Sequence, residues 1–162
     1  MSREIRSFDY VNHPYQAVRN ALSTDALAVF RSATKAAADR ARSVAAELRI
    51  NIGVIEVGAD INIAVKKIEE KILEEEMPVT SIDLEWEATT MPGLFPIMRG
   101  ELAIYPLTAT ETQLDFLGVY DPPLGPVGKA LNAVAGYRVA EATVHRFVRD
   151  VAGYLRESLS KR

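Results

Sequence analysis

Apolar residues recur at every second position along most of the middle of the chain. The alternating segments are residues 50–54, 61–65, 82–88, 98–104 and 114–120, and residues 8–11 suggest a short first strand before them. A period of two is typical of strands that bury one face. Turn signals separate the segments at Gly58 with Ala59, at Pro92 with Gly93, and at residues 108–110. The pattern therefore predicts an antiparallel sheet of about six strands.

A pair of glycines lies inside two neighbouring strands of this predicted sheet. With the turn between the last two strands centred on Ala109, Gly100 lies opposite Gly118. The same register places Leu102 opposite Phe116. Glycine inside a strand weakens it unless the space of the missing side chain is used. The pair either leaves a notch on the inner face or meets a steric need of a curved sheet, and both interpretations stay open.

Apolar positions spaced by three and four residues predict helices on both sides of these strands. A proline opens the first helix, at residues 14–22. Residues 24–48 predict a second helix, whose apolar stripe consists mostly of small residues, with alanine at positions 33, 37 and 41. A third helix, from residue 130 or 137 to residue 160, has the stronger apolar stripe.

Two short segments carry a family likeness. HPYQAV at residues 13–18 opens the first helix, and YDPPLGPVG at residues 120–128 joins the last strand to the last helix. With the element order, they resemble the START-like (SRPBCC) superfamily of birch-pollen-allergen type. The resemblance implies an α+β helix-grip fold. In that fold a curved antiparallel sheet wraps around a long C-terminal helix, two N-terminal helices follow strand 1, and a ligand cavity lies between sheet and helix.

Composition narrows the function classes. The chain has 162 residues, a net charge of −3 and no cysteine, which fits a single domain over residues 1–162 without disulfides. The charge offers no basic surface for nucleic acid, and no window approaches the ~20 apolar residues of a membrane span. These features favour a cytoplasmic location.

Motifs for bond-making chemistry are missing from the sequence. It contains no Cys/His metal set, no phosphate-binding loop, no dinucleotide fingerprint and no serine elbow. His13 precedes a proline in a turn, and His145 lies one place off the stripe of the last helix, so a structural and a solvated position are expected. We therefore expect no metal, no cofactor and no catalytic residue.

The inner face of the predicted sheet supplies the candidate ligand-binding residues. The alternation along the strands predicts that the side chain of Tyr10 points inward and that Tyr120, at the end of its strand, lies at the cavity mouth. The predicted ligand-binding residues are Tyr10, Ile52, Val54, Ile63, Val65, Trp86, Met98, Gly100, Leu102, Phe116, Gly118, Tyr120 and Phe147. Apolar walls with few polar groups are the usual make-up of a small-molecule pocket.

Given the resemblance, different functions remain open. The expected one is binding or transport of a hydrophobic small molecule such as a lipid, an isoprenoid or a polyketide-like compound. The alternative is an enzyme of polyketide cyclase or aromatase type, which would act by holding its substrate in the cavity. A further alternative is an interaction module with a closed core that forms a homodimer through its alanine-rich helix.

Overall fold

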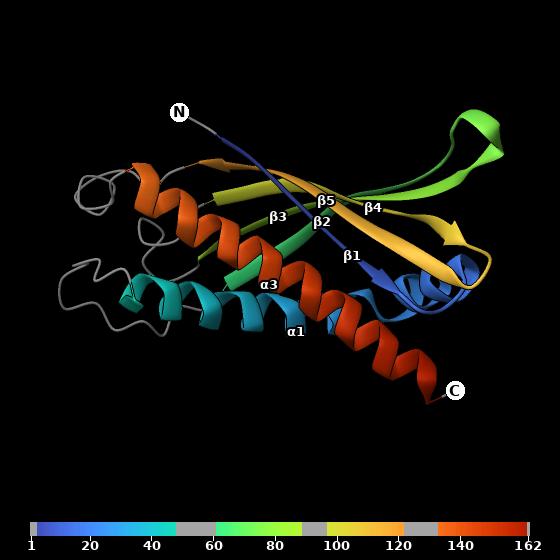
Figure 1. Ribbon diagram of the computed structural model, residues 1–162, viewed down its shortest axis with the longest axis horizontal. Helices are drawn as coiled ribbons and strands as arrows, with labels where there is room; N and C mark the ends of the chain where they lie inside the picture. Colours follow the sequence, from blue (N-terminus) through green and yellow to red (C-terminus); the bar gives the residue numbers. More distant parts are fainter. Residues whose placement is uncertain (1–2, 48–60, 89–96, 122–132, 162) are drawn as a thin grey trace.

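The fold is built on a five-stranded sheet in a computed structural model that describes residues 3–47, 61–88, 97–121 and 133–161 (Figure 1). The strands are β1 (Arg3–Val11), β2 (Ile61–Ile72), β3 (Pro78–Ala88), β4 (Ile97–Thr108) and β5 (Glu111–Asp121). Neighbouring strands are antiparallel, in the order β1-β5-β4-β3-β2. Among the described residues the sheet has five strands, and the strand predicted at residues 50–54, with the hairpin at Gly58 and Ala59, lies outside those residues.

The register of β4 and β5 is the predicted one. Gly100 pairs with Gly118, and Leu102 pairs with Phe116. A tight turn at residues 109–110 joins the two strands. This register holds because a slip by one residue would turn every apolar side chain of a strand to the other face.

β2 is longer than the sequence pattern predicted. A bulge after Val65 shifts its register, and pairing with β3 then continues through Ile72, beyond the alternating segment at residues 61–65. The hairpin closes through η1 (Glu74–Glu76), in which Glu75 and Glu76 have φ values of 62° and 58°. Left-handed backbone angles cost a residue with a side chain about 1–2 kcal/mol, so the tip of this hairpin is strained.

Helices cover one face of the sheet. α1 (Tyr15–Glu47) contains a non-helical Asp25, with φ −121° and ψ 27°, which divides it into the two N-terminal helical segments that were predicted. α3 (Ala133–Ser160) crosses the same face diagonally, and α1 lies beside it (Figure 1). Helices segregated to one face of an antiparallel sheet, with a long C-terminal helix across it, make the predicted helix-grip fold.

An aromatic cluster joins the helices to the sheet at the centre of the core. It consists of Phe30 of α1, Phe116 of β5 and Phe147 of α3, all fully buried. The ring of Phe147 stacks on Phe30 with 6.2 Å between centroids and meets Phe116 edge-on at 6.1 Å. Such aromatic pairs add about 0.5–1.5 kcal/mol each beyond their burial, so this cluster fixes the helix layer on the sheet.

The inward orientation predicted for Tyr10 is wrong. β1 buries Ile5, Ser7 and Val11, so its odd-numbered residues face the helices, and Tyr10 is 47% exposed. The guanidinium of Arg156 lies 5.3 Å from the centroid of the Tyr10 ring and donates to the Tyr10 carbonyl at 2.7 Å. The prediction failed because the segment at residues 8–11 has apolar residues at both parities, so alternation alone could not choose the buried side.

Candidate functional site

The centre of the concave face is closed by the protein's own side chains. A Cβ atom added at Gly100 would lie 2.8 Å from Cε2 of Phe116 and 3.0 Å from the carbonyl oxygen of Leu117. The ring of Phe116 therefore occupies the space that Gly100 leaves. The notch that the glycine pair suggested is filled from within the sheet and is not open to a ligand at this point.

Beyond this closed centre, the next row of the sheet contains a buried tyrosine. Backbone pairing aligns Trp86 with Met98, Met98 with Tyr120, and Tyr120 with Arg3; these positions are called the Tyr120 row. Tyr120 is only 4% exposed. Burial raises the pKa of its phenol, and the nearby positive charge of Arg3 lowers that pKa in part.

The hydroxyl of Tyr120 lacks a hydrogen-bond partner among the residues that the structure describes. Most buried polar side-chain atoms have at least one partner, in the protein or in ordered water. The inner face therefore presents one buried donor and acceptor that a ligand or a water molecule could satisfy.

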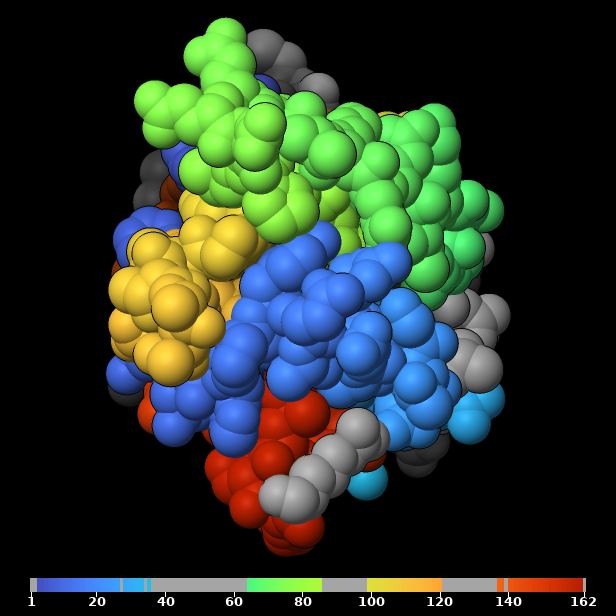
Figure 2. Space-filling view, turned by 90° about the vertical axis from the view of Figure 1, so that its right-hand side faces the viewer, coloured from blue at the N-terminus to red at the C-terminus, as the bar shows by residue number. Residues whose placement is uncertain are grey.

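The edge of the concave face at β2 is left uncovered by the helices. Val65 pairs with Leu84 and Ile68 pairs with Ile82, so these side chains share the inner face. Leu84 and Ile82 are each 2% exposed, whereas Val65 is 36% and Ile68 53% exposed. We call Val65 and Ile68 the β2 strip. Figure 2 views this side of the molecule, with the β2–β3 hairpin in green beside the start of α1 in blue and part of β3 visible between them.

Polar contacts fasten α1 to the sheet near the β2 strip. The hydroxyls of Tyr15 and Thr80 share a hydrogen bond of 2.7 Å, and the guanidinium of Arg19 forms an ion pair with the carboxylate of Glu70. These contacts hold the first turns of α1 over β2 and β3. The exposed β2 strip therefore lies beside a helix whose position is fixed by these contacts.

A serine–histidine pair links β1 to α3. The hydroxyl of Ser7 and Nδ1 of His145 are 2.7 Å apart, which is the spacing of an activated nucleophile and its base. Ser7 is 2% exposed and His145 is exposed, so a substrate could not reach the serine oxygen. We interpret the pair as a structural link. His13 is also part of a structural contact, since the hydroxyl of Thr112 donates to its carbonyl at 2.7 Å.

The remaining predicted ligand-binding residues lie in different surroundings. Leu102, Phe116 and Phe147 belong to the closed core. Ile63, Trp86 and Met98 are placed by backbone register alone, and Ile52 and Val54 lie outside the described residues. The residues of this face that the sequence did not single out are Arg3, Tyr15, Ser7, Ile68 and Tyr137. Arg3, Ser7 and Ile68 each continue the inward parity of their strand once the start of β1 and the bulge in β2 are known.

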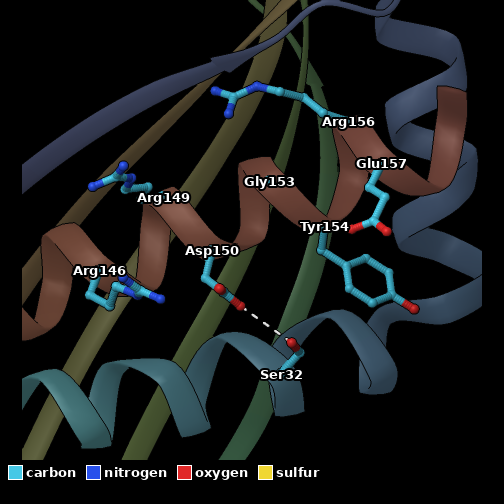
Figure 3. Close-up of a pocket in the computed structure, with 8 residues that line it drawn as sticks. All are labelled: Ser32, Arg146, Arg149, Asp150, Gly153, Tyr154, Arg156 and Glu157. Carbon is cyan, nitrogen blue, oxygen red and sulfur yellow. Dashed lines mark hydrogen bonds between the residues drawn. The ribbon is translucent and has the colours of Figure 1, made fainter.

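A separate hollow lies on the outer side of the helix layer, between α1 and α3 (Figure 3). Its volume is about 390 Å³, and its lining consists of Ser32, Arg146, Arg149, Asp150, Gly153, Tyr154, Arg156 and Glu157. Several of its charges are already engaged by the protein. Arg156 is held by Asp9 at 2.7 Å, Glu157 by Lys161 at 3.0 Å, and Asp150 accepts a hydrogen bond from Ser32 at 3.3 Å. This polar hollow is not the apolar cavity that the sequence predicted.

Metal ions and membrane spans find no support in the described part of the chain. Among those residues, no group of three or more histidine, aspartate or glutamate side chains could hold a metal ion. No helix in the same ranges is long and apolar enough to cross a membrane.

Comparison with known proteins gives similar structures and no similar sequence. No protein-family model matches the chain, and no curated protein matches it. The Zhui aromatase/cyclase from Streptomyces sp. R1128 is 13% identical, with a TM-score of 0.48 over 98% of this chain and 96% of that chain. A protein from Thermus thermophilus is 10% identical, with a TM-score of 0.48 over 96% and 99% of the two chains.

A further similar structure is Ara h 8.0201, which is 6% identical, with a TM-score of 0.44 over 96% of this chain and 98% of that chain. At these identities and scores the likenesses carry no argument about function. The fold assignment rests on the strand order, the register and the helix layer described above.

Proposed function

We propose that the chain binds a hydrophobic small molecule on the inner face of its sheet. The observation that carries the proposal is the β2 strip: Val65 and Ile68 share a face with buried partners, yet α1 and α3 leave them 36% and 53% exposed. Leaving these two apolar side chains in water has a cost in free energy, because burying apolar surface stabilises a protein by about 25 cal/mol for each Å². A ligand that lay on the β2 strip would supply the missing cover.

The β2 strip is continuous with the Tyr120 row in the sheet. Val65 pairs with Leu84, and the next inward position of β3 is Trp86, which belongs to the Tyr120 row. A ligand could therefore extend from the β2 edge along that row to the hydroxyl of Tyr120. Apolar walls with one or two polar groups that set orientation are typical of small-molecule sites.

Binding is proposed in preference to catalysis because of where the polar groups lie. The hydroxyls of Ser7, Tyr15 and Thr80 are engaged in contacts that hold elements together. The Tyr120 hydroxyl is the one described inner-face hydroxyl that we assign to the ligand. A single hydroxyl can orient a molecule, whereas acid–base catalysis needs a group whose protonation state changes at working pH.

The closed-core interaction module is a second candidate with an observation in its favour. The ring of Phe116 fills the Gly100 notch, and Phe147 closes over it from α3. If the rest of the inner face were closed in the same way, the protein would bind no small molecule. The following experiment separates the two functions.

The proposal is tested by titration with 1-dodecanol, a C15 isoprenoid alcohol and a flat polycyclic probe. Emission of Trp86, the only tryptophan, and calorimetry report binding. Ile68→Ser should weaken binding strongly, because it places a hydroxyl on the β2 strip. Leu117→Ser is the matched control, since Leu117 is 47% exposed and pairs with Glu101 and Arg6 outside the inward rows. Binding of no probe by either readout would favour the closed-core module instead.

A further inference from the structure

A cationic side chain lies at the end of the concave face where α3 begins. In Figure 1 the start of β1, the end of β5 and the start of α3 meet at one end of the molecule. Arg3 is the first residue of β1, and it shares the inward parity of Ile5 and Ser7. Its guanidinium carbon lies 5.4 Å from the ring centroid of Tyr137 on α3.

The cation–π contact with Tyr137 holds Arg3 without using its hydrogen-bond donors. A guanidinium that lies over an aromatic ring presents its N–H groups in the plane parallel to the ring. Among the described residues, no acidic side chain pairs with Arg3. The guanidinium of Arg3, whose N–H groups match the geometry of a carboxylate, is therefore held by Tyr137 and has no anionic partner among the described residues.

Tyr120 supplies an independent observation at the same place. It is the cross-strand neighbour of Arg3, so the two side chains share the inner face. Its hydroxyl is buried, and the described residues offer it no hydrogen-bond partner. A buried hydroxyl beside an unpaired guanidinium forms a donor pair for an oxygen-bearing group.

The start of α3 adds positive potential to this end of the site. The first turn of α3 carries no acidic side chain, so no carboxylate of that turn opposes the partial positive charge of the helix start. The positive end of a helix dipole favours negative charge within the first turn. It acts here in the same direction as the charge of Arg3.

We propose that Arg3 and Tyr120 bind the anionic group of the ligand, so that the molecule held on the inner face is an apolar acid with a carboxylate at the α3 end. This inference rests on the proposed function, because the apolar part of such a ligand would lie along the Tyr120 row. Arg3 is exposed, so the carboxylate would sit at the mouth while the chain extends inward. An acid at the mouth keeps its charge partly hydrated and avoids the cost of burying it.

The test compares dodecanoate with 1-dodecanol, which have the same chain length and differ in the charged group. Calorimetric titration of the full chain at low salt should show dodecanoate binding about tenfold more tightly, the effect of one partly exposed charge-assisted hydrogen bond. Arg3→Gln should remove this advantage and leave the affinity for dodecanol within about twofold. Tyr120→Phe should weaken binding of both probes, and of dodecanoate more, because a phenol donates a stronger hydrogen bond to a carboxylate than to an alcohol.

Arg138→Gln is the matched control. Arg138 is an exposed residue next to Tyr137, so the variant removes the same charge from the same end without touching the proposed contact. Equal affinity of the wild type for acid and alcohol would overturn the anionic end and leave hydrophobic binding standing. Equal losses in Arg3→Gln and Arg138→Gln would also overturn it, since they would show a general charge effect. If neither probe binds the wild type, the proposed function fails and this inference fails with it.

Discussion

Gly100→Ala should destabilise the protein although alanine is the better strand residue. The new Cβ would lie 2.8 Å from Cε2 of Phe116 and 3.0 Å from the carbonyl oxygen of Leu117. Gly100 has no left-handed backbone angle, so the cost would come from packing alone. The ring of Phe116 cannot move away freely, because it is fully buried against Phe147.

The expected size follows from two opposing effects. Overpacking a well-filled core costs about 1–3 kcal/mol, and removing glycine from a strand returns about 0.5–1 kcal/mol. The net loss in free energy of unfolding should be about 1–2 kcal/mol. For a chain of this size that corresponds to a melting temperature lower by about 2–8 °C.

A double-mutant cycle in denaturant isolates the contact. Phe116→Leu removes the ring atoms that meet the new Cβ but leaves the carbonyl oxygen of Leu117 in place, so Gly100→Ala should cost much less in that background, with a coupling energy of about 1–2 kcal/mol. Gly153→Ala is the control for glycine removal. A Cβ there meets nothing within 4 Å, and a helical glycine costs about 0.5–1 kcal/mol relative to alanine, so this variant should be more stable. If Gly100→Ala stabilised the protein like Gly153→Ala, or if the cycle were additive, the notch would be open and Phe116 would not fill it.

Further variants test other contacts by chemical denaturation. Tyr120→Phe should leave the unliganded protein as stable as the wild type or up to about 1 kcal/mol more stable, because it removes a buried hydroxyl without a described partner. A decrease of about 1 kcal/mol in the free energy of unfolding would show that the hydroxyl has a partner. Burial raises the pKa of Tyr120 in the folded protein. The contribution of its neutral form to stability is therefore complete below the unfolded pKa of about 10 and is lost as the pH rises through the folded pKa. Tyr120→Phe should make the alkaline loss of stability smaller, and an unchanged alkaline profile would contradict the assignment. Arg156→Gln should cost about 1 kcal/mol, since it breaks partly exposed contacts to Asp9 and to the Tyr10 carbonyl, and a neutral result would show that the contact contributes nothing. Glu75→Gly should stabilise the hairpin by about 1 kcal/mol, because φ is 62° there, and destabilisation would mean that the strain is absent.

Local alternation was sufficient to predict the sheet register. Gly100 and Gly118 face each other because the apolar parity of β4 and β5 excludes a slip by one residue and the turn at residues 109–110 fixes the alignment. The same logic failed at Tyr10, where both parities are apolar, and at β2, where a bulge after Val65 changes the parity beyond it. Period-based prediction therefore holds where one face is clearly apolar and no residue is inserted.

The site depended on contacts that no local pattern contains. Arg3 and Tyr137 lie at opposite ends of the sequence, and Ser7 and His145 do as well. The filling of the Gly100 notch is likewise a matter of where one ring points. Parity can place a residue on a face, but side-chain direction and non-local polar pairing follow only from the packed structure.

Native mass spectrometry of the purified protein, before and after organic extraction, tests the central proposal most directly. The proposed function predicts a fraction of the protein that carries one additional small-molecule mass, which extraction removes and which returns when dodecanoate or dodecanol is added. Ile68→Ser should carry less of it than Leu117→Ser. A bare protein mass under all these conditions, with no adduct after either probe is added, would contradict ligand binding on the inner face.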